Sequence, residues 1–243
     1  MLIRGHHSIV RKAQPMPSRQ EDPFSMIAYE ATRCLLKSVG HVDAGRIGLT
    51  FANCMGGWTF CQPQAEKLAA MGPRVVSSYM STAWFPAAAQ GQTTIKLDLQ
   101  GPALTFSSRG TAFVDALVMA DRWLRYGLTD MVMVVASESC GSSFLSAILG
   151  PRVWADAAVC LAVTRGDPVG DDWAVSVADA AAHSEVSDLG HEGDAYRGTS
   201  VQGACAVALA MMDLMDAGHG QIEMGGFRVV AADQHLIVSR VEP

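Results

Sequence analysis

The 243-residue sequence has few charged side chains, since Asp, Glu, Lys and Arg together make up 17% of it. Its formal net charge of −6 offers no basic surface of the kind that binds nucleic acid, so we expect no nucleic-acid partner. No window of about 20 residues is both apolar and free of charge, and we therefore expect no membrane span. With 49% hydrophobic residues, the composition is that of a globular chain with a large core.

Motifs that would indicate a cofactor or a metal are also missing. The patterns G-x-x-x-x-G-K-[ST] and G-x-G-x-x-G do not occur, so we expect no nucleotide cofactor. The histidines and cysteines show no zinc spacing: there is no C-x-x-C, and His191-Glu192-Gly193 does not continue into H-E-x-x-H. Most of the six cysteines sit in apolar runs, as buried free thiols do. This favours a reducing, cytoplasmic location and no metal site.

What is present is an alternation of strand and helix patterns, which predicts a layered α/β fold. Helices are expected at residues 26–39, 64–71, 83–91, 111–126 and 201–217. Strands are expected at residues 46–52, 104–107, 131–136, 156–164, 173–181, 227–232 and 236–241. Ser25 is the N-cap candidate of the first helix, Thr199 or Ser200 that of the last, and residues 1–24 are polar and proline-rich. The stretch 166–172 is the best internal boundary, between a first half (1–165) and a second half (166–243) of one globule.

Residues 101–112 carry the pattern of a turn, a short buried strand, a tight elbow and a helix start. Many α/β enzymes hold a nucleophile at such an elbow, beside the helix N-terminus. Here the elbow, which follows the strand from Ser107 on, carries Arg109-Gly110, and glycine has no side chain to attack with. Ser107 and Ser108 belong to no G-x-S-x-G turn, and we expect a buried serine bonded to the backbone. The chain has the design of an acyl-transfer enzyme without its nucleophile.

Several motifs follow one another in a recognisable order: Arg46-Ile47-Gly48-Leu49, Met55-Gly56-Gly57, Ile95-Lys96-Leu97-x-Leu99-x-Gly101-Pro102, Leu104-Thr105-Phe106-Ser107, Val132–Ala136 with Glu138, and Ala157–Arg165. In order and spacing, residues 25–165 resemble the N-terminal half of β-ketoacyl synthases, the condensing enzymes of the thiolase fold. The family's elbow reads Thr-Ala-Cys-Ala-Ser-Gly, and without a gap its nucleophilic Cys falls on Gly110. The family's two catalytic histidines, in His-Gly-Thr-Gly-Thr and Gly-Asn motifs, have no counterpart here.

The resemblance implies a thiolase-like layered fold with a reduced second half, no catalytic residue and no cofactor. The chain resembles the family's inactive partners, the chain-length factors, and most of all their short form from aryl-polyene-type pathways. An active β-ketoacyl synthase is then the expected heterodimer partner, and we expect acyl carrier protein to bind through that complex. The dimer strand would contain Thr105, Phe106, Ser107, Ser108, Arg109 and Gly110. The segment that crosses the dimer interface and closes the far end of the partner's acyl tunnel would contain Tyr79, Met80, Ala83, Trp84 and Phe85.

Two other functions stay open at this point. The chain could be an acyltransferase or thioesterase that uses a serine or a displaced cysteine, or a homodimeric scaffold that binds acyl carrier protein. Arg109 pairs with a partner's carboxylate, fills the vacated acyl site, or is a solvated turn residue. Trp84 is the sharpest tunnel candidate, because a bulky rigid side chain would shorten the tunnel. Should Phe85 face the chain's own core instead, its truncation would only lower stability.

Overall fold

The computed structural model describes residues 1–12, 20–108, 111–149, 155–167, 170–178, 204–224 and 227–240. Its strands are β1 (Leu2–Lys12), β2 (Ile47–Ala52), β3 (Ala103–Phe106), β4 (Met131–Glu138), β5 (Ala155–Thr164), β6 (Trp173–Ala178), β7 (Gly220–Met224), β8 (Phe227–Ala232) and β9 (His235–Arg240). Its α-helices are α1 (Pro23–Ser38), α2 (Trp58–Met71), α3 (Met80–Ala83), α4 (Ala88–Leu97), α5 (Ala112–Arg125), α6 (Ser143–Leu149) and α7 (Ala204–Ala217). Short 3-10 turns, η1 (Ala44–Arg46) and η2 (Pro73–Val75), complete the described elements.

The described strands form one mixed sheet in the order β3-β2-β4-β5-β1-β6-β9-β8-β7. Strands β3, β2 and β4 are parallel, and β5 runs antiparallel to β4. Every residue of β2 and β4 is buried, as is typical of parallel strands covered on both faces. Strand β3 is the outermost strand at this end of the sheet, so one of its edges has no neighbour among the described residues.

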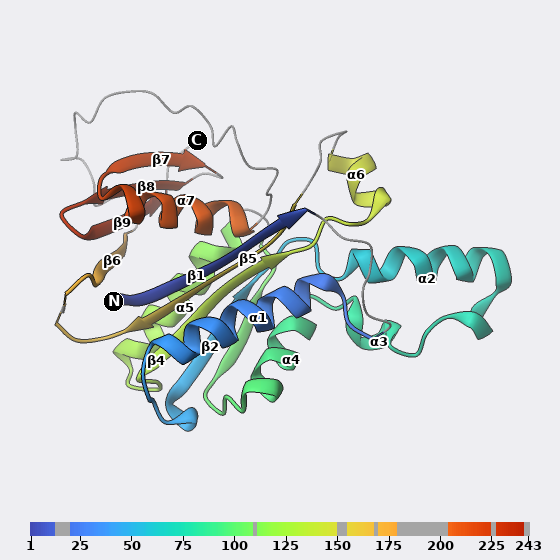
Figure 1. Ribbon diagram of the computed structural model, residues 1–243, viewed down its shortest axis with the longest axis horizontal. Helices are drawn as coiled ribbons and strands as arrows, with labels where there is room; N and C mark the ends of the chain where they lie inside the picture. The colour runs from blue at the N-terminus through green and yellow to red at the C-terminus, as the bar shows by residue number, and fades with distance from the viewer. Residues whose placement is uncertain are drawn as a thin grey trace.

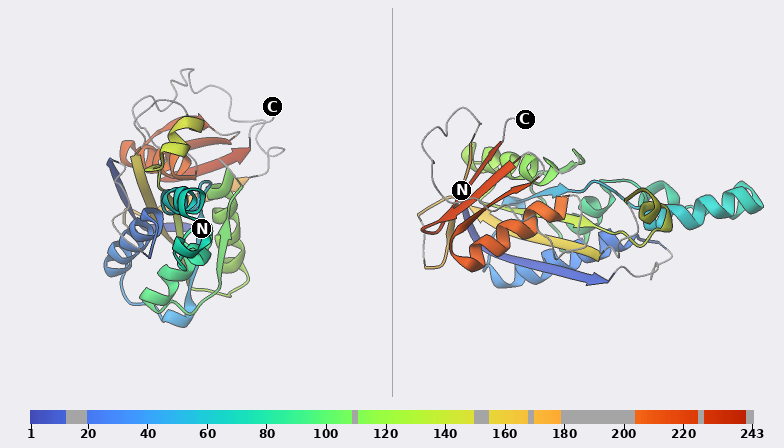
Figure 2. Two further views of the ribbon diagram at one scale, coloured as in Figure 1. Left: turned by 90° about the vertical axis from the view of Figure 1, so that its right-hand side faces the viewer. Right: turned by 90° about the horizontal axis from the view of Figure 1, so that it is seen from above.

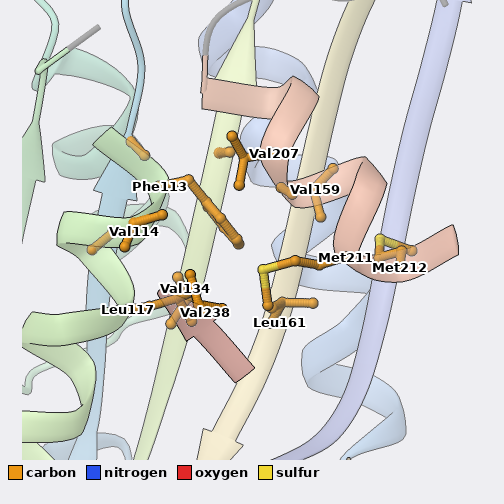
Figure 3. Packing of buried hydrophobic residues seen from close by; sticks show 14 of the residues in the cluster. Phe113, Val114, Leu117, Val134, Val159, Leu161, Val207, Met211, Met212 and Val238 are labelled. Carbon is orange, nitrogen blue, oxygen red and sulfur yellow. The ribbon is translucent and has the colours of Figure 1, made fainter. Parts of the chain in front are cut away.

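Helices cover the two faces of the sheet in separate layers (Figure 1). Helices α1 and α4 pack on one face, where their apolar side chains meet those of β2, β4 and β5. Helices α5 and α7 pack on the other face, and β7 and β8 pack against α7. Figure 3 shows the resulting core, in which Phe113 and Leu117 of α5 and Met211 of α7 meet Val134 of β4 and Leu161 of β5. The layered α/β fold is confirmed.

Strand β1 was not expected, because residues 1–24 look polar in the sequence. The structure places β1 inside the sheet, where it pairs with β5 along ten positions and with β6 at Leu2 and Ile3. From Arg4 to Arg11 its side chains are only partly buried or exposed, so they leave no alternating apolar pattern to find. Backbone pairing with β5, with full side-chain burial only at Leu2 and Ile3, therefore accounts for this strand.

Helix boundaries differ from the prediction at three places. Asp22, not Ser25, is the N-cap of α1: its side chain accepts a hydrogen bond from the main-chain N of Phe24, and Pro23 occupies the first turn. Helix α2 starts at Trp58, before the expected 64–71. The single helix expected at 83–91 is two helices, α3 and α4, separated at Pro86, whose ring disfavours helical backbone in the residue before it.

The remaining expected elements are confirmed to within a few residues, and β7 and α6 are additional. The end of the strand expected at 173–181 and the capping candidates Thr199 and Ser200 lie outside the described residues. No helix in the described ranges has both the length and the apolar character needed to cross a bilayer.

Candidate functional site

The elbow follows directly from the end of β3. Strand β3 ends at Phe106, Ser107 and Ser108 come next, and α5 starts at Ala112. The two residues that carry the lost-nucleophile interpretation, Arg109 and Gly110, lie outside the described residues. Because β2, β3 and β4 are parallel, the carboxyl ends of the three strands meet at one edge of the sheet, which is where α/β proteins commonly place a ligand.

Ser107 and Ser108 are exposed and bond to side chains, which corrects the expectation of a buried serine bonded to backbone. The Ser107 hydroxyl donates to the side-chain oxygen of Asn53 at 3.3 Å. The Ser108 hydroxyl donates to the carboxylate of Asp115, which also accepts from the Thr111 hydroxyl at 3.1 Å. The reason is position: both serines lie just beyond the last residue of β3 rather than within the strand. Neither hydroxyl contacts a histidine in the described structure.

A groove of about 500 Å³ lies beside the elbow, between the end of β3 and one face of α5. Its lining contains no cysteine, histidine or lysine, and consists of Thr105, Phe106, Ser107, Ser108, Asp115, Val118, Met119 and Arg122. Leu104 of β3, which does not line this groove, is 40% exposed. The groove offers a strand edge and a helix face, and no residue set for nucleophilic chemistry.

The second group of expected site residues lies on a projecting segment, residues 58–86, which we call the arm (Figures 1 and 2). It contains α2, η2 and α3. Tyr79, Trp84 and Phe85 are 43%, 48% and 50% exposed, and the rings of Trp84 and Phe85 meet edge to face at 6.0 Å. Phe85 therefore does not face the chain's own core. The expectation that truncation of Phe85 would only lower stability, which depended on a core position, does not apply.

Met80 and Ala83 differ from the three aromatic residues because they attach α3 to α2. Ala83 is fully buried, and the sulfur of Met80 lies 3.8 Å from that of Cys61. The main-chain N of Gly57 donates to the carbonyl of Trp84 at 3.1 Å. A Cβ on Gly57 would lie 2.0 Å from the carbonyl oxygen of Ala83, so the close approach of α3 requires glycine here. The expected tunnel-end residues are thus divided: three aromatic rings face outward and two side chains hold them in place.

Two buried carboxyl groups hold the connection between β2 and α2. Glu138, at the end of β4, accepts from the main-chain N atoms of Cys54 at 2.6 Å and Met55 at 3.1 Å, and from that of Ala204 in α7 at 3.2 Å. Burial raises the pKa of Glu138 to about 7, and the hydrogen bonds from these N–H groups oppose the rise. The carboxylate therefore joins three segments that are distant in the sequence.

Asp22 plays the same part on the other side of this connection. One of its oxygens caps α1, and the other accepts from the main-chain N of Phe60 in α2 at 2.7 Å. Burial raises the pKa of Asp22 to about 7, against the N–H groups that donate to it. Asp22 and Asn53 were not among the site residues expected from the sequence. The pattern Asp-Pro before an apolar helix, and a polar residue directly after a buried strand, are the signals that identify them.

Four of the cysteines make poor nucleophiles. Burial raises the pKa of the Cys54, Cys140 and Cys160 thiols to about 12. It also raises the pKa of Cys205 well above the ordinary value. The reactive form of cysteine is the thiolate, which these surroundings disfavour. No group of three or more metal-ligating side chains is found in the ranges that the structure describes.

Comparison with known proteins finds similarity to ketoacyl synthases over the first half of the chain. The family model "Beta-ketoacyl synthase, N-terminal domain" matches residues 9–152. The tetracenomycin polyketide synthase ketoacyl synthase beta subunit of Streptomyces glaucescens is 33% identical over 134 residues, which cover 52% of this chain and 33% of that protein. A polyketide beta-ketoacyl synthase 2 of Streptomyces cyaneus is 34% identical over 127 residues, 49% of this chain and 30% of that protein. The chain matches about a third of the length of these relatives.

Solved structures share the fold. A chain from a type II polyketide synthase acyl-carrier protein in complex with its ketosynthase superposes with a TM-score of 0.56 at 26% identity, over 60% of this chain and 47% of that one. A chain from a ketosynthase in complex with its chain length factor, from Xenorhabdus doucetiae, gives a TM-score of 0.51 at 18% identity, over 64% of each chain. The family match over residues 9–152, more than half of the chain, together with this fold, shows that the chain belongs to the β-ketoacyl synthase family.

Proposed function

We propose that this chain is a non-catalytic, chain-length-factor type subunit that pairs with an active ketosynthase and forms part of the wall of its acyl tunnel. The observation that carries the proposal is the edge of β3 that has no neighbour among the described residues, together with the three half-exposed aromatic rings of the arm. An unpaired strand edge and exposed aromatic side chains are costly in water and are the usual elements of a partner interface. The names of the relatives agree, since one is a ketoacyl synthase beta subunit.

The chemistry of this elbow supports a partner rather than an enzyme. By the sequence resemblance Gly110 stands where the family has its cysteine, and the serine hydroxyls of the elbow bond to Asn53 and Asp115 rather than to a histidine. The acyltransferase or thioesterase alternative therefore has no observation in its favour. Purified chain, free of any ketosynthase, should not elongate an acyl carrier thioester. Gly110→Cys should not create that activity, because an acid–base pair is still required.

The edge of β3 provides the test of the partner. Leu104→Lys places a charge on the exposed strand and should weaken association with a co-expressed ketosynthase at least tenfold. Leu128→Lys is the control, because Leu128 is 52% exposed in the turn between α5 and β4. Size-exclusion chromatography with light scattering measures the pairing. A chain that forms a stable homodimer and ignores the ketosynthase would favour the scaffold alternative instead.

The arm provides the test of the tunnel. Trp84→Ala should lengthen the products of the co-expressed pair by one or more extension units with turnover roughly retained, because a longer acyl chain occupies the vacated volume. A methylene that fits contributes about 0.8 kcal/mol of burial, and one that does not adds about 1–3 kcal/mol of overpacking. Tyr126→Ala, at a 79% exposed aromatic residue outside the arm, is the control. Mass spectrometry of the products decides, and an unchanged distribution with an intact pair would mean that Trp84 only packs.

A further inference from the structure

Asn53 belongs neither to the elbow nor to the arm, yet its side chain bonds to both. It is fully buried and follows directly on the last residue of β2. Its side-chain nitrogen donates to the carbonyl of Pro86 at 2.9 Å, and its side-chain oxygen accepts from the Ser107 hydroxyl at 3.3 Å. A carbonyl oxygen only accepts, so the bond to Pro86 determines which end of the amide faces the arm and which faces the elbow.

The two residues that meet at Asn53 are the boundaries of the two proposed functional segments. Pro86 directly follows Trp84 and Phe85, and Ser107 directly follows the edge strand β3. Between them the chain runs through α4, so the link through Asn53 is much shorter than the path along the backbone. One amide group therefore connects the aromatic surface to the elbow.

Asn53 itself is held firmly on the sheet side. Its main-chain N donates to the carbonyl of Phe106 at 3.1 Å, and the next two main-chain N atoms, of Cys54 and Met55, donate to the buried Glu138. The arm has fewer such attachments near Trp84: the carbonyl of Trp84 accepts from Gly57, and that of Phe85 accepts from Ala88. Asn53 is therefore fixed to the sheet, and through its side chain it holds the arm.

We propose that Asn53 is a positioning residue: it holds the arm against the elbow and so sets how far Trp84 stands from the acyl tunnel of the partner. The second part rests on the proposed function, in which Trp84 closes the tunnel. The first part, the attachment of the arm, does not rest on it. A buried amide that loses one partner leaves that partner unsatisfied, so its loss should release the arm rather than change the chemistry of a site.

Three variants separate the two ends of the link. Asn53→Asp, studied at alkaline pH so that the carboxyl group is ionised, keeps an oxygen for the Ser107 hydroxyl but turns a carboxylate oxygen toward the carbonyl of Pro86, and so releases the arm. Asn53→Ala removes both bonds. Ser107→Ala removes only the elbow bond and, because Ser107 is exposed, folds even if the Asn53 variants do not. Each variant is co-expressed with the ketosynthase, and the intact pair is purified.

Hydrogen exchange reports on the arm directly. The amides of Gly57 and Ala88, bonded to the carbonyls of Trp84 and Phe85, should exchange at least tenfold faster in Asn53→Asp than in the wild type. The amides of β4 should keep their wild-type rates. Ser107→Ala should give a smaller acceleration in the same amides. Unchanged exchange of Gly57 and Ala88 in every variant that folds would overturn the inference.

Product length reports on the consequence. Asn53→Asp should broaden the product distribution by at least one extension unit, and should have no further effect when combined with Trp84→Ala, because it acts through that side chain. A merely structural role would lower total product without this dependence on Trp84. If Trp84→Ala alone shifts product length and the Asn53 variants do not, the positioning role is wrong. If Trp84→Ala has no effect, the proposed tunnel function fails, and the exchange rates alone decide whether Asn53 holds the arm.

Discussion

At the scale of single residues, Asp22 shows how one buried carboxyl group organises two helices. It accepts from Phe24 at the start of α1 and from Phe60 in the first turn of α2. Asp22→Ala would leave both N–H groups buried without an acceptor, at about 1–3 kcal/mol each. Removal of a carboxyl group whose ionised form is disfavoured by burial offsets part of that cost. We expect the free energy of unfolding to fall by about 2–4 kcal/mol, measured by urea denaturation.

Asp43→Ala is the matched control for this change. Asp43 also accepts from a main-chain N, that of Gly45 at 3.0 Å, but it is exposed and caps only the short turn η1. Its loss should cost about 1 kcal/mol or less. Equal effects of the two substitutions would show that the link between α1 and α2 adds nothing to a simple cap.

At the scale of elements, the position of α3 depends on a glycine in the loop before α2. Gly57→Ala would bring a Cβ to 2.0 Å from the carbonyl oxygen of Ala83, so α3 must shift or the chain must strain. Overpacking of this kind costs about 1–3 kcal/mol. Gly91→Ala in α4 meets nothing within 4 Å and should stabilise the chain by about 0.4–1 kcal/mol. Thermal melting of the two variants should show shifts of opposite sign, and similar shifts would contradict the close approach.

At the scale of the whole molecule, the buried carboxyl groups make stability depend on pH. The pKa values of Asp22 and Glu138 rise from 3.8 and 4.5 to about 7, chiefly through burial. Between these limits the folded chain binds protons that the unfolded chain releases. The free energy of unfolding therefore falls as pH rises from about 4 to 7 and levels off above 7. These shifts correspond to roughly 4 kcal/mol for Asp22 and roughly 3 kcal/mol for Glu138.

Denaturation curves at pH 5, 6, 7 and 8 measure this slope. Glu138→Gln removes one titrating group and should flatten the decline, although the variant is less stable overall because its amide faces N–H donors. Glu66→Gln, at an exposed position in α2, should leave the slope as it is. A slope that Glu138→Gln does not change would show that Glu138 ionises in the folded chain as easily as it does in the unfolded one.

The sequence by itself determined the elements whose signal is local. A continuous apolar run identified β4, helical periodicity identified α1 and α5, and motif spacing identified the ketosynthase-like first half. These signals survive without tertiary structure because neighbouring residues carry them. The exposed aromatic residues of the arm were also found in this way, although their exposure and the division from Met80 and Ala83 were not.

The tertiary structure alone decided the features that join distant segments. Strand β1 depends on backbone pairing with β5, and the link through Asn53 joins Pro86 to Ser107. Glu138 accepts hydrogen bonds from main-chain N–H groups of a loop and of α7, and Asp22 accepts them from the starts of two helices. Such hydrogen bonds depend on which groups meet after folding. A single Asn, Asp or Glu forms no periodic pattern in the sequence from which its hydrogen-bond partner could be predicted. For this reason the sequence pointed to the elbow and the arm, and only the fold showed what holds them together.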